Sequence, residues 1–480
     1  MYKLILILLV LTNSAFAYQL KKSDTLPNIV IIFTDDQGYA DVGVYGAKGF
    51  TTPNLDRMAE EGMRFTDFYV ASSVCSPSRA ALLTGCYPQR VGIPSVLFPE
   101  RENTEWDPTD RRTKTGIHPD ETTIAEMLKE NGYATACFGK WHLGHHKPFL
   151  PLQQGFDEYF GLPYSNDMRP GKKPGKTPYP KLPLMKNNDV YRYMEDDQSM
   201  LTTEYTEYAV DFIQRKKDRP FFVYLAHTMP HIPLYVSEKF AGRSEKGIYG
   251  DVIEEIDWSV GQINKILKEL ELEENTLVIF SCDNGPWLIF GDHGGSADPL
   301  REGKFTTFEG GQRVPCLMKW PELIPEGKEC NEIASTLDFL PTIADITGAK
   351  LPDKKIDGHN IIDLMKAKKN AKSPTKQFFY YRTWDLEAVR SGKWKLHVPH
   401  QYNKVIKSDE GNAHGRKNIK SRIGLSLFDL SVDISEQNNI AKDHPEVVKR
   451  LLKKMDRMKE DLGDGENSGK GRRECGFFTK

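Results

Sequence analysis

The sequence predicts an α/β fold in which a large, mostly parallel β-sheet is flanked by helices. Three apolar, β-branched runs, residues 28–33, 221–226 and 277–280, are typical of strands buried on both faces of a parallel sheet. Between them lie residues 122–131 and 251–272, whose apolar side chains recur at helical spacing on one face. Strands that alternate with such helices are the pattern of an α/β protein.

The chain changes character after residue 375. Residues 18–375 carry the α/β pattern, whereas residues 376–462 contain short strand-like pieces and then a Lys-rich amphipathic helix from about Pro445 to Leu462. We therefore predict a large first domain over 18–375 and a smaller C-terminal α+β domain over 376–462. Residues 463–480 are polar and Gly-rich, which predicts a mobile tail.

The N-terminus has the pattern of a secretory signal peptide over residues 1–17. Lys3 precedes an apolar run at residues 4–11, and Ala-Phe-Ala at residues 15–17 fits a cleavage site. This run is too short to span a bilayer, and no later stretch of the sequence is long and apolar enough to do so. We expect an exported protein, periplasmic or secreted, with no membrane span. A buried first strand or helix is the alternative interpretation.

Charge and cysteine content narrow the class of protein further. The 480 residues carry a formal net charge of -2, which argues against a nucleic-acid-binding protein because such proteins need a broad basic field. The seven cysteines are widely and irregularly spaced, which favours neither zinc nor a dense disulfide framework. An odd count leaves at least one thiol outside any disulfide. A cysteine that is set apart from disulfide pairing for a chemical role of its own fits this count.

Polar, ionisable residues follow each of the three predicted strands. They are Asp35 and Asp36, then the segment 227–231 with a histidine at each end, then Asp283 and Asn284. The carboxyl ends of parallel strands form the ligand-binding edge of an α/β sheet, so we expect these groups to meet. Carboxylate and amide oxygens suit Ca²⁺ or Mg²⁺ and are poor ligands for zinc. Separate strand-end turns, where Asp and Asn are common, are the alternative.

Cys75 opens a second candidate site, the segment Cys-Ser-Pro-Ser-Arg over residues 75–79. Pro77 suits the first turn of a helix and Gly85 suits its end. Cys75 would then lie just before a helix N-terminus, where the helix dipole and free N–H groups favour an anion. Arg79 lies one turn further along and can reach back toward Cys75. The alternative is a buried cysteine ahead of a short helix.

This segment, with the Leu-Thr-Gly that follows at residues 83–85, resembles the signature of the type I sulfatases. Gly-Lys-Trp-His-Leu-Gly at residues 139–144 resembles the second signature of that family, and residues 303–311 resemble its sulfate-binding lysine segment. Pro-His-Ile-Pro at residues 230–233 is similar to the segment that carries its substrate histidine. These motifs cover most of residues 28–320. Within the family, the chain is most similar to the arylsulfatase A and N-acetylgalactosamine-sulfatase branch.

The resemblance implies an alkaline-phosphatase-like fold and a sulfuric ester hydrolase activity in the first domain. In this family a separate formylglycine-forming maturation enzyme oxidises the signature cysteine, which implies that Cys75 becomes formylglycine (3-oxoalanine). It also implies one Ca²⁺, whose ligands correspond to Asp35, Asp36, Cys75, Asp283 and Asn284. The implied catalytic residues are Cys75, Arg79, Lys140, His142, His231 and Lys304.

The resemblance also implies individual roles. Arg79 and Lys140 would hold the hydrated formylglycine, and His142 would assist the proton removal that releases sulfate. His231 and Lys304 would bind the sulfate, and one of them would protonate the leaving alcohol. A packed core histidine is the alternative interpretation of His142. Two further histidines, His145 and His146, are interpreted as structural or supporting residues, as is His227.

Basic residues near these motifs favour a polyanionic substrate such as a sulfated carbohydrate, although a solvated loop is the usual meaning of such a run. They are Arg169, Lys172, Lys173, Lys176 and Lys181, with Arg101, Arg111, Arg112 and Lys114 as additions. Ser165 resembles a family serine that faces the substrate. Two alternatives stay open: a phosphodiester or phosphonate hydrolase of the same superfamily, and a non-catalytic sulfoglycan-binding protein if Cys75 is not matured.

Overall fold

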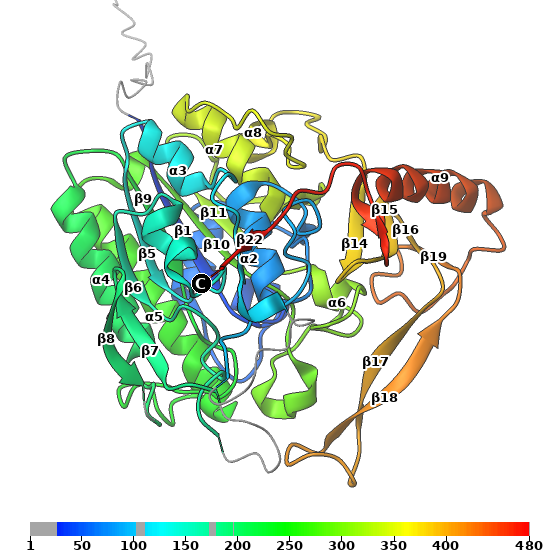
Figure 1. Cartoon of the computed structure of the whole chain (residues 1–480), viewed down its shortest axis with the longest axis horizontal. Coiled ribbons are helices and arrows are strands. Elements are labelled where there is room, and N and C mark those ends of the chain that lie inside the picture. Colours follow the sequence, from blue (N-terminus) through cyan, green and yellow to red (C-terminus); the bar gives the residue numbers. More distant parts are fainter. Residues whose placement is uncertain (1–25, 102–110, 172–178, 195, 480) are drawn as a thin grey trace, which may run out of the picture.

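The structure is a computed structural model that describes residues 26–101, 111–171, 179–194 and 196–479. Within them, a large mixed sheet with helices on both faces is followed by a smaller C-terminal domain built on a separate antiparallel sheet (Figure 1). The predicted fold class is therefore confirmed. The predicted signal peptide at residues 1–17 lies outside the described residues.

The large sheet is parallel at its centre, from β10 to β6, and antiparallel where β11 and β7 join it. From edge to edge its strands are β12 (Lys328–Cys330), β2 (Met63–Phe65), β11 (Cys316–Lys319), β10 (Thr276–Cys282), β1 (Asn28–Thr34), β9 (Phe221–Ala226), β5 (Ala134–Gly139), β6 (Glu158–Gly161), β7 (Leu182–Lys186) and β8 (Asp189–Met194). The three strands expected from the sequence are the adjacent β10, β1 and β9. Their carboxyl ends therefore share one edge.

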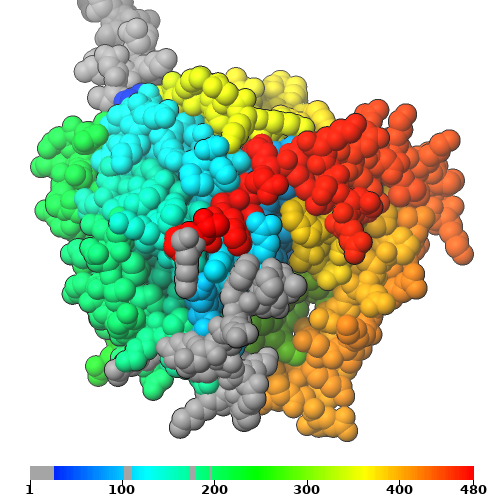
Figure 2. Space-filling view, in the orientation of Figure 1, coloured from blue at the N-terminus to red at the C-terminus, as the bar shows by residue number. Residues whose placement is uncertain are grey.

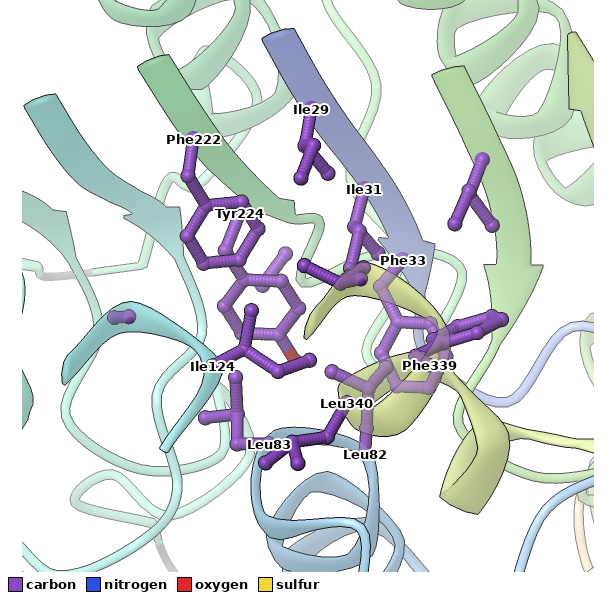
Figure 3. Close-up of a cluster of buried hydrophobic side chains, with 14 of the residues drawn as sticks. Ile29, Ile31, Phe33, Leu82, Leu83, Ile124, Phe222, Tyr224, Phe339 and Leu340 are labelled. Atoms are coloured by element: carbon purple, nitrogen blue, oxygen red, sulfur yellow. The ribbon is translucent and has the colours of Figure 1, made fainter. Parts of the chain in front are cut away.

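Alternate residues of β1 point into two separate cores. Ile31 and Phe33 pack with residues of α2, α3 and α7 on one face (Figure 3), whereas Val30 and Ile32 pack with residues of α1, α4 and α5 on the other. Burying each such side chain contributes about 1.5–3 kcal/mol. Because both faces are covered, the strand has to be apolar throughout, which is why it appears as an unbroken run.

Two of the helices that form these layers, Ile124–Glu130 and Gly247–Glu269, overlap the two periodic segments expected from the sequence. None of the helices in the described part of the chain is long and apolar enough to cross a membrane. The helices are α1 (Pro53–Glu60), α2 (Cys75–Thr84), α3 (Ile124–Glu130), α4 (Leu201–Lys216), α5 (Gly247–Glu269), α6 (Glu309–Gln312), α7 (Phe339–Thr347), α8 (Ile362–Met365) and α9 (Pro445–Leu462).

The C-terminal domain is a four-stranded antiparallel sheet packed against α9. A separate two-stranded hairpin extends away from this sheet (Figure 1). The sheet strands are β14 (Phe378–Arg382), β15 (Asp385–Ser391), β16 (Trp394–His397) and β19 (Ser426–Asp429), and the hairpin strands are β17 (His400–Lys407) and β18 (Arg416–Ile423).

A buried ion network joins the two domains. The carboxylate of Glu309, on α6, lies 2.8 Å from Lys395 Nζ on β16, and Lys395 Nζ lies 3.0 Å from Glu436. All three side chains are fully buried. Nearby, Asp67 forms ion pairs with both Arg313 and Arg390. Because a buried charge without its partner is strongly unfavourable, this network ties the C-terminal sheet to the first domain.

The C-terminal residues 463–479, part of the segment predicted to be a mobile tail, contact the first domain. In the tail, β22 (Gly476–Phe477) pairs antiparallel with β4 (Thr115–Gly116) of the first domain. Arg473 Nε also donates to Glu121 at 2.6 Å. The tail is polar and Gly-rich, but a few specific long-range contacts hold it, and composition does not reveal such contacts.

Candidate active site

The carboxyl edge of the large sheet gathers three aspartates. Asp35 and Asp36 follow β1, and Asp283 and Asn284 follow β10; the pairing of Thr34 with Cys282 sets the two segments side by side. The backbone N–H of Asp36 donates to Asp283 Oδ1 at 3.2 Å. Asn284 Nδ2 donates to Asp36 Oδ1 at 2.7 Å. All four side chains are buried, so the structure brings together the groups that the sequence placed at separate strand ends.

The donor atoms in this cluster fit a hard metal ion. One oxygen from each of Asp35 and Asp283 and the sulfur of Cys75 lie within 4.8 Å of one another. Among the described residues, Asp35 Oδ1 and Asn284 Oδ1 are buried without a hydrogen-bond partner. Buried polar oxygens in native proteins are almost always satisfied. Oxygen-rich donors of this kind are typical of calcium or magnesium sites.

The pKa values of Asp35 and Asp283 are shifted in opposite directions by their surroundings. Burial, and next the neighbouring Asp35 carboxylate, raise the pKa of Asp283 to about 7. Burial also raises the pKa of Asp35, but Lys140 and other nearby cations lower it by more, so the net pKa lies well below the usual range. Positive charge at this edge is therefore what keeps the Asp35 carboxylate ionised.

Cys75 is the first residue of α2, so the helix begins one residue earlier than predicted. Val74, in an extended conformation, is the N-cap residue. The helix ends as predicted at Gly85, whose φ of 65° is the left-handed conformation that glycine adopts readily. Cys75 is only 2 % exposed. Burial raises the pKa of its thiol to about 11. The unmodified thiol is therefore a poor nucleophile at neutral pH, because the thiolate is the reactive form.

Arg79 connects three parts of the cluster. Its Nε and Nη2 donate to Asp283 Oδ2 at 3.0 and 2.8 Å, and its Nη1 donates to the Lys140 carbonyl oxygen at 2.8 Å. The side chain is completely buried. Because the guanidinium is planar, this two-pronged contact with the carboxylate fixes its orientation.

Lys140 follows β5 and reaches into the same cluster. Gly139 precedes it with φ of 116°, and a Cβ there would lie 1.8 Å from the Ala226 carbonyl oxygen, so the close approach of β5 to β9 requires glycine. Lys140 Nζ donates to Asp35 and, at 3.1 Å, to Ser165 Oγ. Burial lowers the pKa of Lys140, but Asp35 and the other acidic groups around it together raise it by more, so the net pKa is above its ordinary value. Lys140 is therefore a cation at neutral pH.

Lys304 and His231 flank Asp36. Lys304 Nζ lies 2.7 Å from each carboxylate oxygen of Asp36, and His231 Nε2 lies 3.5 Å from Asp36 Oδ2. His231 Nδ1 lies 2.6 Å from the Ile232 carbonyl oxygen, which can only accept, so Nδ1 carries the proton and Nε2 faces the cluster. Burial lowers the pKa of His231.

His142 lies near the same groups with one unused ring nitrogen. Its Nε2 lies 2.9 Å from the Leu97 carbonyl oxygen, which places the ring proton on Nε2. Its Nδ1 is buried and has no hydrogen-bond partner among the described residues. Burial, and next the charge of Lys140, hold the pKa of His142 well below its ordinary value. The imidazole is therefore neutral and offers a lone pair at Nδ1.

Sequence reasoning missed two aromatic residues at this site. The Trp287 ring lies 4.5 Å from Lys304 Nζ and 5.6 Å from the His231 ring. Phe305, next to Lys304, has φ of 72° and is 41 % exposed. Left-handed backbone is a genuine outlier for a bulky residue and clusters at functional sites. The available signal was their place in the sequence, because Trp287 closely follows Asn284 and Phe305 directly follows Lys304.

Other residues considered from the sequence lie outside the cluster. His227 Nε2 lies 3.1 Å from Ser259 Oγ, and burial lowers the pKa of His227 to about 3, so it stays neutral. Arg169 forms an ion pair of 2.6 Å with Asp196. Lys172, Lys173 and Lys176 lie outside the described residues.

Comparison with known proteins matches this arrangement to one family. The sulfatase family model matches residues 27–349, and the model for the C-terminal region of N-sulphoglucosamine sulphohydrolase matches residues 303–461. Arylsulfatase A of Homo sapiens is 39 % identical over 91 % of this chain and 88 % of its own length. N-acetylgalactosamine-6-sulfatase of Canis lupus familiaris is 41 % identical over 77 % of this chain and 71 % of its own.

A solved structure agrees with these matches. The crystal structure of the PsFucS1 sulfatase from Pseudoalteromonas sp. superimposes with a TM-score of 0.78, at 26 % identity, over 94 % of this chain and 92 % of that chain. The chain belongs to the sulfatase family and is a sulfuric ester hydrolase. Within that family it is similar to arylsulfatase A and to N-acetylgalactosamine-6-sulfatase.

Proposed function

We propose that the protein hydrolyses sulfate esters of a carbohydrate with a formylglycine made from Cys75 and one bound Ca²⁺. The observation that supports this most is one buried cluster. It holds Cys75 at a helix N-terminus, three aspartates and three paired cations, Arg79, Lys140 and Lys304. An anionic ester and a divalent cation are the ligands that this combination of charges can hold together.

Both Ca²⁺ and a formylglycine fit the residues of the cluster. Asp35, Asp36, Asp283, Asn284 and an oxygen of the formylglycine made from Cys75 would hold the Ca²⁺, which would supply positive charge to a nucleophile and to a sulfate oxygen. Formylglycine, once hydrated to a geminal diol, supplies one hydroxyl to attack sulfur and a second whose deprotonation re-forms the carbonyl and expels sulfate. The raised pKa of the unmodified Cys75 thiol supports a modified nucleophile.

The protein's own residues orient the reactants and move protons. Arg79 and Lys140 both contact the same oxygen of Asp35 and place positive charge next to residue 75. Lys304 and His231 both contact Asp36 and would bind the sulfate. A donor from this pair protonates the leaving alcohol. Fixed cationic donors aimed at developing charge are each worth about 3 kcal/mol in the transition state.

His142 is proposed as the base that releases sulfate. Its neutral ring presents an unpaired Nδ1, and the Leu97 carbonyl holds the opposite nitrogen as the protonated one. This tautomer can accept the proton of the second hydroxyl without rearrangement. Ser165, hydrogen-bonded to Lys140, is proposed as a substrate contact.

A sulfated carbohydrate is proposed as the substrate, on the similarity to N-acetylgalactosamine-6-sulfatase and the glycan-related C-terminal match. We also propose that the protein is exported, on the signal-like pattern of residues 1–17. A formylglycine-forming enzyme is the partner that this activity requires.

Peptide mass spectrometry of the exported protein tests the nucleophile. The peptide that contains Cys75 should show the mass loss that accompanies conversion of a thiol to an aldehyde, and a Cys75→Ala variant should have no turnover. Fully unmodified Cys75 in active native protein would contradict the proposal. Unmodified Cys75 in inactive recombinant protein would instead locate the failure in the host's maturation enzyme.

Turnover of matched esters tests the reaction class. Sulfate and phosphate monoesters and phosphodiesters of the same alcohol should be compared at saturating Ca²⁺. We expect the sulfate ester to have the highest kcat/KM. Faster turnover of the phosphorus esters would favour the phosphodiester or phosphonate hydrolase alternative.

A further inference from the structure

A cavity opens directly beside the candidate nucleophile. It has a volume of about 390 Å³ and lies between the segment before α2 and the C-terminal hairpin β17–β18. Val74, the neighbour of Cys75, and Phe305, the neighbour of Lys304, both line it. The cavity wall therefore includes the residues directly next to Cys75 and Lys304 in sequence.

The cavity wall is basic. Three basic residues, Arg112, Arg382 and Lys420, line it, and none of its described lining residues is acidic. Arg382 is held in place by Glu387, whose carboxylate accepts from Arg382 Nε at 2.6 Å. Lys420 has no acidic partner among the described residues and is exposed. Lys420 therefore offers its charge to a ligand, whereas the charge of Arg382 is partly neutralised.

The register of the hairpin explains how Lys420 comes to face the cavity. Lys420 is paired with Asn403 across the ladder, and side chains of directly opposed residues lie on the same face. Gln401, two positions from Asn403, lies on that face too, and all three line the cavity. Tyr402, on the opposite face, is buried against Phe308. The polar side chains Gln401, Asn403 and Lys420 thus face the cavity from one side of the hairpin, and Tyr402 adds to the cavity wall from the other side.

The same side of the hairpin carries three further basic residues, Lys407, Arg416 and Arg422. Every residue with a full charge in the two strands is basic, and their ladder shows no acidic residue. The hairpin extends away from the C-terminal sheet (Figure 1) and is drawn in orange in Figure 2. The residues on the cavity-facing side are Gln401, Asn403, Val405, Lys407, Arg416, Asn418, Lys420 and Arg422.

Phe305 supplies a flat apolar surface at the mouth of the same cavity. Its ring is 41 % exposed although the backbone adopts a left-handed φ of 72°. The Phe305 N–H donates to the Ser73 carbonyl oxygen at 3.1 Å, which ties this conformation to the segment before Cys75. An exposed aromatic ring next to cations and amides is a suitable surface for a sugar ring, which has apolar C–H faces and polar edges.

From these contacts we infer that the cavity between Phe305 and the β17–β18 hairpin binds a second, anionic sugar residue of the substrate, next to the sulfated one. Phe305 packs against the sugar ring, and Lys420 binds its sulfate or carboxylate group, with Gln401 and Asn403 bonding its hydroxyls. This inference rests on the proposed carbohydrate sulfatase function. It adds that recognition extends beyond one sugar and requires a second negative charge.

Matched substrates and variants test the inference. Turnover by the matured, Ca²⁺-loaded protein is compared on a small aryl sulfate, on a sulfated disaccharide with a neutral neighbouring sugar, and on disaccharides whose neighbouring sugar carries a carboxylate or a second sulfate. Lys420→Ala should lower kcat/KM about fivefold to tenfold on the doubly anionic disaccharides only. Lys404→Ala, on the opposite face of the same hairpin, is the matched control and should change no substrate by more than about twofold.

The two anionic disaccharides distinguish the sources of the second charge. If Lys420→Ala lowers kcat/KM more on the disulfated disaccharide, the subsite binds a sulfate group. If it lowers kcat/KM more on the disaccharide with a carboxylate, the subsite binds a carboxylate group. Phe305→Ala should raise KM on all disaccharides. The inference would be overturned if Lys420→Ala lowered kcat/KM equally on every substrate. It would also be overturned if Lys404→Ala lowered kcat/KM on the doubly anionic disaccharides as much as Lys420→Ala does.

A binding measurement separates this inference from the proposed activity. Calorimetric titration of Cys75→Ala protein with the doubly anionic disaccharides does not depend on turnover. Lys420→Ala in that background should weaken binding about fivefold to tenfold, and added salt should reduce the difference. Unchanged affinity in the Lys420→Ala variant would overturn the inference even if the matured parent protein is an active sulfatase. Weakened binding in that variant, together with no sulfate turnover by the matured parent protein, would overturn only the proposed function.

Discussion

At the scale of single residues, the site is defined by paired charges. Each of three cations lies against one of three aspartates: Arg79 against Asp283, Lys140 against Asp35, and Lys304 against Asp36. Such buried pairs are a poor way to stabilise a fold, since desolvation offsets most of the attraction. Their concentration beside one cysteine is instead typical of a site that binds an anion and a metal ion together.

Removal of the Lys304 ammonium group tests this interpretation. Lys304→Ala in matured, Ca²⁺-loaded protein should lower kcat/KM for a sulfate ester by about 10²–10³-fold, because a fixed cationic donor to the sulfate is lost. Lys328→Ala, at an exposed position on β12, is the control and should leave activity within about twofold. The measurement is steady-state kinetics on a small aryl sulfate. A loss below about tenfold would contradict a direct role for Lys304.

At the scale of secondary-structure elements, close backbone approach positions the site. β5 ends at Gly139, whose missing side chain leaves room for the Ala226 carbonyl oxygen of β9. The next residue, Lys140, donates its backbone N–H to that same carbonyl at 2.7 Å. The direction in which Lys140 enters the cluster therefore depends on the strand end and not only on its own side chain.

Gly139→Ala should disturb both stability and activity. The new Cβ would overlap the Ala226 carbonyl oxygen, so β5 has to move and Lys140 moves with it. Gly132→Ala is the matched control, since Gly132 also has a positive φ, of 85°, but no atom within 4 Å of the added Cβ. We expect Gly132→Ala to cost about 1–2 kcal/mol with normal activity. Gly139→Ala should cost more and lower kcat/KM. Urea unfolding and kinetics measure both, and equal behaviour of the variants would contradict the prediction.

The buried network between the domains is a second element-scale feature. It connects β16, through Lys395, to α6, through Glu309, in the segment that follows Lys304. The backbone N–H of Gly285, next to the candidate metal ligand Asn284, donates to the Gly311 carbonyl oxygen at 3.0 Å. The C-terminal domain thereby supports the segment that places Lys304 and Asn284.

Lys395→Met should destabilise the protein by about 3–5 kcal/mol, because it leaves Glu309 and Glu436 buried without their shared cation. Lys393→Met is the control on the same segment. Lys393 is half exposed and pairs with Asp429, so its removal should cost about 0–1 kcal/mol. Urea denaturation followed by fluorescence gives both values. Similar losses in the two variants would show that burial of the network does not decide its contribution.

At the scale of the whole molecule, segments far apart in sequence bring their charged side chains to the carboxyl edge of one sheet. The formal net charge is only -2, so attraction of an anionic substrate depends on local placement of cations and not on an overall field. The three aspartates come from two strands of one sheet, and their repulsion is relieved by cations that arrive from other segments. Bound Ca²⁺ would add to that relief.

Calcium should therefore stabilise the fold. Because the folded state offers the assembled ligands and the unfolded chain does not, free Ca²⁺ at about a hundredfold above its Kd should stabilise by about 2.7 kcal/mol. Removal with a chelator should lower Tm, and readdition should restore it. Asp283→Asn should lose most of this calcium dependence, whereas Asp353→Asn, an exposed carboxylate, should keep it. A Tm independent of calcium in the parent protein would contradict the metal assignment.

The sequence by itself determined the α/β class, the three central strands and the groups at their ends. It could do so because strands buried on both faces must be apolar. In addition, the residues that follow neighbouring parallel strands all lie at the same edge of the sheet. The motif around Cys75 likewise predicted a helix that ends at Gly85, since proline and glycine have fixed local preferences. These are local constraints, and a sequence expresses local constraints directly.

Only the tertiary structure decided which groups pair and which stay unpaired. Lys304 meets Asp36 across 268 sequence positions, and Arg79 meets Asp283 across 204. The free Nδ1 of His142 depends on a carbonyl oxygen 45 positions away. The polar face of the hairpin and the packed tail follow from contacts between domains in the same way. Such pairings depend on how the whole chain closes on itself, and no local preference of the residues specifies them.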